Sequence, residues 1–151
     1  MFVATGTPTA QTITNNGFFP SINSDELVKT QKLDGAISAE RIVFALTLAM
    51  SDCNQSLVGW QLLQQAAGYT QLDDVPSTQI NAISRLVTLY KQAVFSTAKA
   101  HLIEQYRDYD TTASGNKKAE DVGSNIDVYR RDAQWALSDM QGKSRSVVEL
   151  I

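Results

Sequence analysis

The sequence predicts an all-α fold, an antiparallel helical bundle of three long helices with a short N-terminal helix before them and flexible arms at both ends. Apolar residues recur at helical spacing in three long segments, and Gly or Pro residues separate these segments. No pair of strands joined by a hairpin turn is evident. At 151 residues with 43% hydrophobic and 19% charged side chains, the chain has the size and composition of one globular domain.

The N-terminal part of the sequence predicts a flexible arm followed by a short helix. Residues 1–17 are rich in Thr, Asn and Gln and contain no charged side chain, so we expect an extended or mobile arm. The apolar cluster at 18–22 should anchor this arm, since its two phenylalanines are costly to leave in water. Ser24 is the expected N-cap of a short helix with Asp25 and Glu26 in its first turn.

The first long helix is expected from Ser38, its N-cap, to about Ala67. Gly68 is placed as a C-terminal stop, and the polar loop after it ends at Pro76. The apolar side chains form one helical stripe at Ile42, Leu46, Ala49, Met50, Cys53, Leu57 and Trp60. An amphipathic helix of this kind buries one face.

The second long helix is expected to start at Ser77 or Thr78 and to reach Tyr109, because no Gly or Pro interrupts the pattern before Gly115. At 1.5 Å per residue it would span roughly 45 to 50 Å. Additional apolar residues widen its surface beyond one stripe. We therefore expect the central helix of the fold, contacted on two sides.

A turn is expected over 111–116, followed by a third long helix that Gly142 ends. Its apolar residues recur at Ala119, Val122, Ile126, Tyr129, Ala133, Ala136, Leu137 and Met140. The sequence after it is too short for an independent element and finishes in apolar residues, which usually need a partner surface. The expected organisation is an arm at 1–17, a helical domain at 18–141 and a partner-binding tail at 142–151.

The charge and cysteine content exclude several classes of protein. Thirteen Lys and Arg residues and sixteen Asp and Glu residues give a net charge of −3, without the basic excess that non-specific phosphate binding requires. Cys53 is the only cysteine and His101 the only histidine, which excludes disulfides within the chain and zinc sites with several Cys and His ligands. This usage fits cytosolic folding. Neither a long apolar run nor a secretory signal is evident, so we expect no membrane contact.

No arrangement of residues indicates catalysis or cofactor binding. His101, Glu104, Asp108 and Asp110 lie on neighbouring turns like half of a bundle metal site, but no second histidine exists to complete it. Cys53 lies on the apolar stripe, where a cysteine packs as a small hydrophobic side chain. We therefore expect no catalytic residue, no metal and no cofactor.

The charged residues of the third helix allow two interpretations. Lys117 and Lys118 fit a solvated first turn, and contact with an acidic partner or a DNA backbone is the alternative. Arg130 and Arg131 can pair with acidic neighbours in their own helix, and a role between subunits is the alternative. Trp135 lies one position off the cleanest register, which indicates partial exposure.

Ordered sequence blocks carry a family resemblance. From about Phe18 to Met140 they are LDG with SAERIVFALTLAMSDCN, GW with AAGYTQLDDVP, LYKQAVFSTAKAHLIEQYRDYDTT, GNKKAE and YRRDAQWALSD. This set resembles the head completion (head stabilisation) protein family of tailed temperate phages of the peduovirus type. The clearest matches are Asp34, Gly35, Arg41, Trp60, Gly68, Tyr69, Val75, Pro76, Tyr90, Ala98, Tyr106, Arg107, Asp110, Arg130, Arg131 and Trp135. Most of them look structural or interfacial, and none carries a catalytic role.

The resemblance implies a structural virion protein that is not an enzyme. It would be a helical adaptor that binds the portal vertex as a ring after DNA packaging, seals the capsid and offers a platform for the tail. Its partners would be the portal ring, neighbouring copies in a dodecamer, a tail-side connector protein, and phage DNA that passes through the lumen without sequence-specific binding. It would assemble in the host cytoplasm and be located at the head-tail connector of the virion. Because exposed ion pairs between copies are weak, we expect a monomer when the chain is free.

Two sets of site residues follow as hypotheses. Related ring adaptors commonly dock on the portal through C-terminal segments, so portal binding is expected from Val147, Val148, Leu150 and Ile151. Opposite charges can pair across the seam between subunits, which gives Glu104, Asp108, Asp110, Lys117, Lys118, Arg130 and Arg131. A cytosolic helical interaction module without enzymatic activity is the alternative function. A bundle enzyme or metal protein is disfavoured by its missing ligands.

Overall fold

The computed structural model describes residues 10–33, 37–107 and 113–145, with their side chains except those of 106–107 and 113–124. Its elements are β1 (Thr12–Ile13), β2 (Ile22–Asn23), α1 (Ser24–Gln31), α2 (Ala39–Ser56), α3 (Val58–Ala66), the 3₁₀ helix η1 (Leu72–Asp74), β3 (Gln79–Ile80), β4 (Ile83–Ser84), α4 (Arg85–Arg107) and α5 (Ala113–Met140). The fold is mainly helical. It is not all-α as predicted, because the short antiparallel pairs β1–β2 and β3–β4 accompany the helices.

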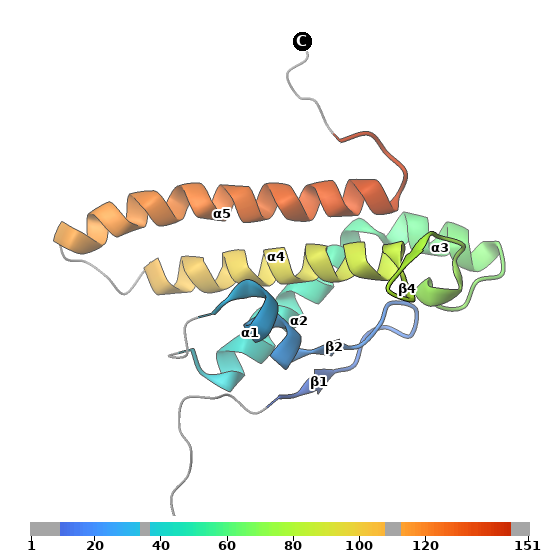
Figure 1. Ribbon diagram of the computed structural model, residues 1–151, viewed down its shortest axis with the longest axis horizontal. Helices are drawn as coiled ribbons and strands as arrows, with labels where there is room; N and C mark the ends of the chain where they lie inside the picture. Colours follow the sequence, from blue (N-terminus) through green and yellow to red (C-terminus); the bar gives the residue numbers. More distant parts are fainter. Residues whose placement is uncertain (1–9, 34–36, 108–112, 146–151) are drawn as a thin grey trace, which may run out of the picture.

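Helix α4 is the centre of the fold, as its two-sided apolar surface predicts. Figure 1 shows α5 running beside α4 in the opposite direction, with α1 and α2 on the other side of α4. The side chains of Tyr90, Ala93, Val94 and Ala98 are completely buried between these helices. The two alanines allow neighbouring side chains to pack close to the α4 backbone.

The first predicted long helix is instead two helices, α2 and α3, which meet at Leu57 with a 62° bend. Its ends are as predicted, since Ser38 caps α2 and Gly68, with a φ of 103°, follows α3. Sharp bends without proline form at Gly and Ser, and here Ser56 and Gly59 flank the completely buried Leu57. In the described part of the chain no single helix is long and apolar enough to span a membrane, although α2 and α3 reach that length and composition together.

The second long helix starts later than predicted. Ile80 pairs with Ile83 in the β3–β4 hairpin, and α4 begins only at Arg85. Asn81 and Ala82, between the strands, have φ values of 56° and 61°, the geometry of a tight hairpin turn. The sequence pattern misses this turn because Asn81 is followed by alanine and not by the usual glycine. With 23 residues, α4 is about 35 Å long, shorter than expected.

The N-terminal segment lies extended against the helices. Strand β1 pairs with β2, and the Gln11 carbonyl accepts a hydrogen bond from the Ser24 backbone. Phe18 and Phe19 are 2% and 3% exposed, which confirms that this cluster anchors the segment. Residues 10–17, predicted as part of a flexible arm, are therefore held against the body. The rest of that arm lies outside the described residues.

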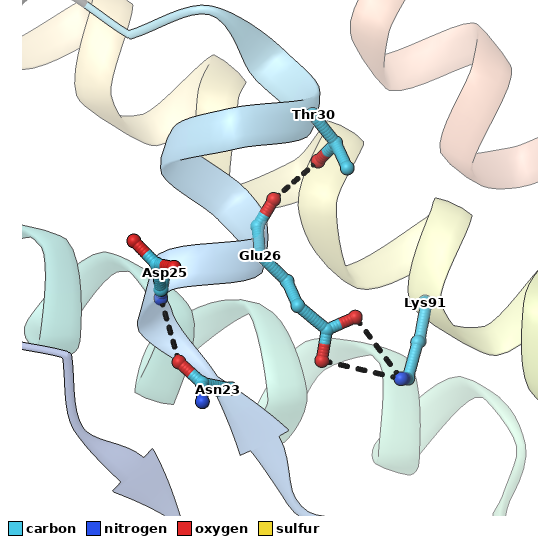
Figure 2. Close-up of polar contacts among 5 residues, drawn as sticks. All are labelled: Asn23, Asp25, Glu26, Thr30 and Lys91. Carbon is cyan, nitrogen blue, oxygen red and sulfur yellow. Dashed lines mark hydrogen bonds and ion pairs between the residues drawn. The ribbon is translucent and has the colours of Figure 1, made fainter.

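Helix α1 is capped one residue earlier than predicted and is tied to α4. Asn23, in place of Ser24, is the N-cap, because its Oδ1 accepts a hydrogen bond from Asp25 N at 2.8 Å (Figure 2). Figure 2 also shows Glu26 extending from α1 toward α4, where Lys91 Nζ lies 3.3 and 3.1 Å from its two carboxylate oxygens. Both side chains are partly exposed, so this ion pair orients α1 more than it stabilises it.

Helix α5 starts earlier than predicted. It begins at Ala113, so part of the expected turn at 111–116 is helical. The residue types at 113–116 favour a turn only weakly, and tertiary contacts commonly override such a preference. The predicted end is confirmed, because α5 stops at Met140 and Gly142 adopts a φ of 69°. The last six residues of the predicted tail lie outside the described residues.

Candidate functional site

Most of the exposed large apolar side chains in the described residues lie on α3 and on the β3–β4 hairpin. We call them the apolar end surface, and its members are Val58, Leu62, Leu63, Ile80 and Ile83. Leu63 and Ile80 are 69% and 70% exposed. Both elements lie at the same end of the molecule in Figure 1. Apolar side chains that gather on neighbouring exposed elements are typical of contacts with other proteins, so this surface is a candidate site for another protein.

The rest of the structure fixes α3 from one side. Leu57 is completely buried at the bend. The Trp60 ring meets the Phe18 ring edge to face at 6.3 Å, and Asn16 Nδ2 donates a hydrogen bond to Gln61 Oε1 at 3.1 Å. No residue of α3, all of which is described, is buried. One side of α3 thus contacts the rest of the protein, while its two leucines are exposed to solvent.

The hairpin presents its isoleucines from a strained turn. Ile80 and Ile83 are directly opposed in the β3–β4 pair, so their side chains lie on one face of the hairpin. Asparagine tolerates the left-handed conformation of Asn81, but at Ala82 the Cβ atom crowds the following carbonyl oxygen. Strain of this kind persists where function or packing requires it.

The apolar end surface carries little charge. Between Asp52 and Arg85 the sequence contains two charged residues, Asp73 and Asp74, and Arg85 itself is exposed directly after the hairpin. Both are exposed on η1, and Asp74 Oδ2 accepts a hydrogen bond from the Thr70 hydroxyl at 3.1 Å. A nucleic acid needs basic side chains for its phosphates. An apolar surface with few charged side chains fits a protein partner instead.

A second exposed feature lies on α5. The Trp135 indole is flanked by two guanidinium groups, with Arg131 Cζ 4.3 Å and Arg145 Cζ 4.6 Å from the ring centroid. Trp135 is half-buried, which confirms the predicted partial exposure, and Val128 is exposed further along the helix. We call Val128, Arg131, Trp135 and Arg145 the Trp135 face. Trp and Arg are the residues that most often dominate the binding energy of protein interfaces.

The residues predicted to pair across a subunit seam are placed unequally. Arg130 forms an ion pair with Glu104, which joins α5 to α4 within one chain, and Arg131 Nη2 lies 3.1 Å from Asp132 Oδ1. Both arginines thus have intrachain partners. Lys117 and Lys118 lie on α5, where the structure describes the backbone only. The remaining predicted seam and portal-binding residues, Asp108, Asp110, Val147, Val148, Leu150 and Ile151, lie outside the described residues. The seam and portal assignments stay predictions.

His101 and Cys53 line the same pocket of about 410 Å³ between α2, α4 and α5. His101 Nε2 lies 3.4 Å from Asp52 Oδ2, close enough for an ion pair but without hydrogen-bond geometry. Burial raises the pKa of Cys53 to about 12, so the thiol stays protonated at neutral pH. The core-packing interpretation of Cys53 is confirmed. In the ranges that the structure describes, no three His, Cys, Asp or Glu side chains are grouped to hold a metal ion.

Sequence reasoning missed the apolar end surface. The expected straight helix places Trp60 on its apolar stripe and treats Leu62 and Leu63 as incidental. The sequence feature that could have revealed it is the absence of charged residues over 53–72, where apolar residues also lie outside the single buried stripe. A helix buried on one face normally carries charges on the other.

Comparisons with known proteins agree with one another. Residues 13–151 match the family model described as phage head completion protein (GPL). The chain is 37% identical over 139 residues to the head completion/stabilization protein of Escherichia phage P2, which covers 92% of this chain and 82% of that protein. It is 28% identical over 141 residues to the probable head completion/stabilization protein of Haemophilus phage HP1 (strain HP1c1), with 92% and 91% covered. No solved structure matches the chain significantly.

Proposed function

This chain belongs to the phage head completion protein (GPL) family, and on that premise we propose that it is a head completion adaptor of the virion. It binds the portal vertex as a ring after DNA packaging, seals the capsid and provides a platform for tail attachment. The observation that carries the proposal is the family match, which extends over residues 13–151. Family membership supports a structural role in head assembly, and the portal, the ring and the seal are the finer steps that we add.

The apolar end surface supports a role in assembly. An adaptor joins proteins on several of its sides, and each contact needs exposed side chains that complement a partner. Leu62 and Leu63 supply such side chains from α3, which the buried Leu57 and the Phe18 contact hold in place, and Ile80 supplies another from the hairpin. A rigid surface of this kind binds without the cost of ordering itself first.

A phage carrying a nonsense mutation in the gene for this chain tests the function. We expect filled heads that lose their DNA, lack tails and do not infect. Full-length protein supplied from a plasmid should restore infectivity, and so should the variant Gln92→Ala, which changes an exposed residue of α4 that belongs to neither surface. Mutant particles that keep nuclease-resistant DNA and infect normally would overturn the proposal.

Portal binding is assigned to the C-terminal tail, through Val147, Val148, Leu150 and Ile151. These residues are aliphatic and follow α5 in the sequence. Deletion of 143–151 should abolish co-sedimentation with purified portal rings while circular dichroism shows unchanged helicity. The matched control is the full-length variant Ser144→Ala with Ser146→Ala. Its tail has the same length and charge and keeps the four aliphatic residues, so it should bind. Retained binding by the deleted chain contradicts the assignment.

The ring is proposed to form on the portal and not in free solution. Exposed ion pairs contribute about 0 to 1 kcal/mol each, so weak seams depend on a template that holds many copies close together. Multi-angle light scattering of the free chain at micromolar concentration should give the mass of a monomer. A stable ring without portal contradicts this part of the proposal.

A further inference from the structure

We infer that Trp135 and Asp139 bind the side chain of Arg145 and thereby fix the direction in which the chain leaves α5 toward the C-terminal tail. Trp135 and Asp139 are then positioning residues for that tail. Their effect on portal binding rests on the proposed function, whereas the contact with Arg145 does not.

The chain reverses its direction where α5 ends. Gly142 has a φ of 69°, and its N–H donates a hydrogen bond to the Asp139 carbonyl at 3.1 Å. The Lys143 N–H donates to the Ser138 carbonyl at 3.0 Å. These two bonds form a Schellman motif, a common end of helices that are followed by a left-handed glycine. Figure 1 shows the chain turning back over α5 after this point.

Arg145 joins the reversed segment to α5 by two kinds of contact. Its Nη2 lies 3.1 Å from Asp139 Oδ2 and its Nε lies 3.4 Å from Asp139 Oδ1, so two N–H groups meet one carboxylate. Its Cζ is 4.6 Å from the centroid of the Trp135 ring. Trp135 and Asp139 lie one turn apart on the same face of α5. A planar guanidinium suits this pair, because it can bind a carboxylate with two N–H groups and stack on an aromatic ring.

Both partners of Arg145 are held in position on α5. The Asp139 side chain is 18% exposed, which limits the positions that its carboxylate can take. Arg131 contacts the indole of Trp135, with its Cζ 4.3 Å from the ring centroid. Arg131 pairs with Asp132, which leaves Asp139 to Arg145. Groups that are already in position bind at a smaller cost in entropy, so α5 offers Arg145 a prepared site.

A fixed Arg145 gives the tail a defined starting point. Val147, the first residue to which portal binding is assigned, follows two positions later in the sequence. Anchoring a chain so close to the residues that bind reduces the conformational entropy that binding costs. Portal rings should therefore bind a chain with the intact Arg145 contact more tightly than a chain without it.

Limited trypsin digestion of the free chain tests the contact. Trypsin takes an arginine side chain into its own specificity pocket before it cleaves the next bond, so Arg145 must first leave Asp139 and Trp135. Asp139→Asn should raise the initial rate of cleavage after Arg145 about two- to fivefold, the effect of one exposed ion pair. Trp135→Leu should raise it by a similar factor, because it removes the stacked ring. Mass spectrometry of the products measures this rate and the rate of cleavage after Lys32, an exposed reference site at the end of α1.

Two matched variants serve as controls for the digestion. Asp127→Asn removes an exposed carboxylate that lies earlier on the same helix and should leave cleavage after Arg145 unchanged. Asp139→Glu keeps the carboxylate and should retain most of the protection. If neither Asp139→Asn nor Trp135→Leu raises cleavage after Arg145 relative to cleavage after Lys32, the contact is overturned.

Co-sedimentation with purified portal rings tests the positioning role. Asp139→Asn should weaken binding about two- to fivefold, while Asp127→Asn and Asp139→Glu should bind like the native chain. Faster cleavage after Arg145 together with unchanged portal binding overturns the positioning role and leaves the contact standing. A native chain that does not bind portal rings overturns the proposed function, and the digestion still decides whether the Arg145 contact exists.

Discussion

The phenolic hydroxyl of Tyr90 donates a hydrogen bond to Asn54 Oδ1 at 2.6 Å in a partly buried contact. Asn54 Nδ2 donates to Asn15 Oδ1 at 2.8 Å, and Asn15 Nδ2 donates back to the Tyr90 oxygen at 2.8 Å. The three side chains form a closed cycle that joins α4, α2 and the N-terminal segment. Phe19 stacks on the Tyr90 ring with the centroids 4.7 Å apart, so the same tyrosine also holds the phenylalanine anchor.

The variant Tyr90→Phe keeps the stack on Phe19 and removes the hydroxyl. Asn54 and Asn15 then each lose a partner in a place that water reaches poorly, so we expect the free energy of unfolding to fall by about 1 to 3 kcal/mol. Urea denaturation followed by circular dichroism measures the change. The control Tyr69→Phe, at a half-buried tyrosine outside the cycle, should change stability by less than about 0.5 kcal/mol. Equal losses would show that the cycle contributes nothing specific.

Two leucines around the α2–α3 bend should behave in opposite ways. Leu57 is completely buried and Leu62 is 60% exposed. Leu57→Ala leaves a cavity under the bend and should cost about 2 to 5 kcal/mol of unfolding free energy. Leu62→Ala should change it by less than about 0.5 kcal/mol, because its side chain is already in water. Thermal denaturation of both variants checks this, and a large loss for Leu62→Ala would mean that α3 packs on the core in solution.

Helix type and helix ends were predictable from the sequence where they depend on local chemistry. Ser38 marks the start of α2, Gly68 the end of α3 and Gly142 the end of α5, because capping and left-handed backbone need particular residue types. The burial of α4 on two sides was predictable because its apolar residues cover more than one face of the helix. The family was predictable as well, since ordered blocks along the chain are more specific than any single motif.

The bend at Leu57 and the β3–β4 hairpin were not predictable from periodicity. Apolar spacing continues across Leu57 because residues on both sides of the bend contact the same core. The spacing therefore does not reveal that the helix axis changes direction between α2 and α3. At the hairpin, Ala82 adopts a backbone conformation that its residue type disfavours, and local rules give the wrong answer there. Both failures concern the elements that form the apolar end surface, which is why the candidate site was missed.

The strained turn gives a stabilising variant. Ala82→Gly relieves a left-handed conformation that costs about 1 to 2 kcal/mol for a residue with Cβ, and the added freedom of the unfolded chain takes back about 0.5 to 1 kcal/mol. We expect a net gain of about 0.5 to 1 kcal/mol, seen as a higher midpoint of thermal unfolding. Ala82→Val should lower the midpoint, since its branched side chain tolerates this conformation even less. A lower midpoint for Ala82→Gly contradicts the turn geometry.

Two buried groups should make the protein less stable in alkali. Burial raises the pKa of Cys53 from 9.0 to about 12, against a weaker opposing effect of its contact with Thr97, and Asp52 raises it further. Burial also raises the pKa of Tyr90 above its ordinary value of 10.0. In both cases the folded chain keeps a proton that the unfolded chain releases. The stabilisation is therefore complete below the ordinary pKa of each group and is lost as the pH rises toward the pKa of the folded state.

The variant Cys53→Ala isolates the contribution of the thiol. In the native chain, the free energy of unfolding should fall as the pH rises from about 9 toward about 12, with the thiol adding at most about 1.4 kcal/mol per pH unit to the slope. The variant should be less stable at every pH, because it leaves a small cavity, but its slope in this range should be shallower. Urea denaturation at several pH values measures both slopes. Identical slopes would mean that the thiol titrates alike in the folded and unfolded chain, and that water reaches Cys53 from the pocket beside His101.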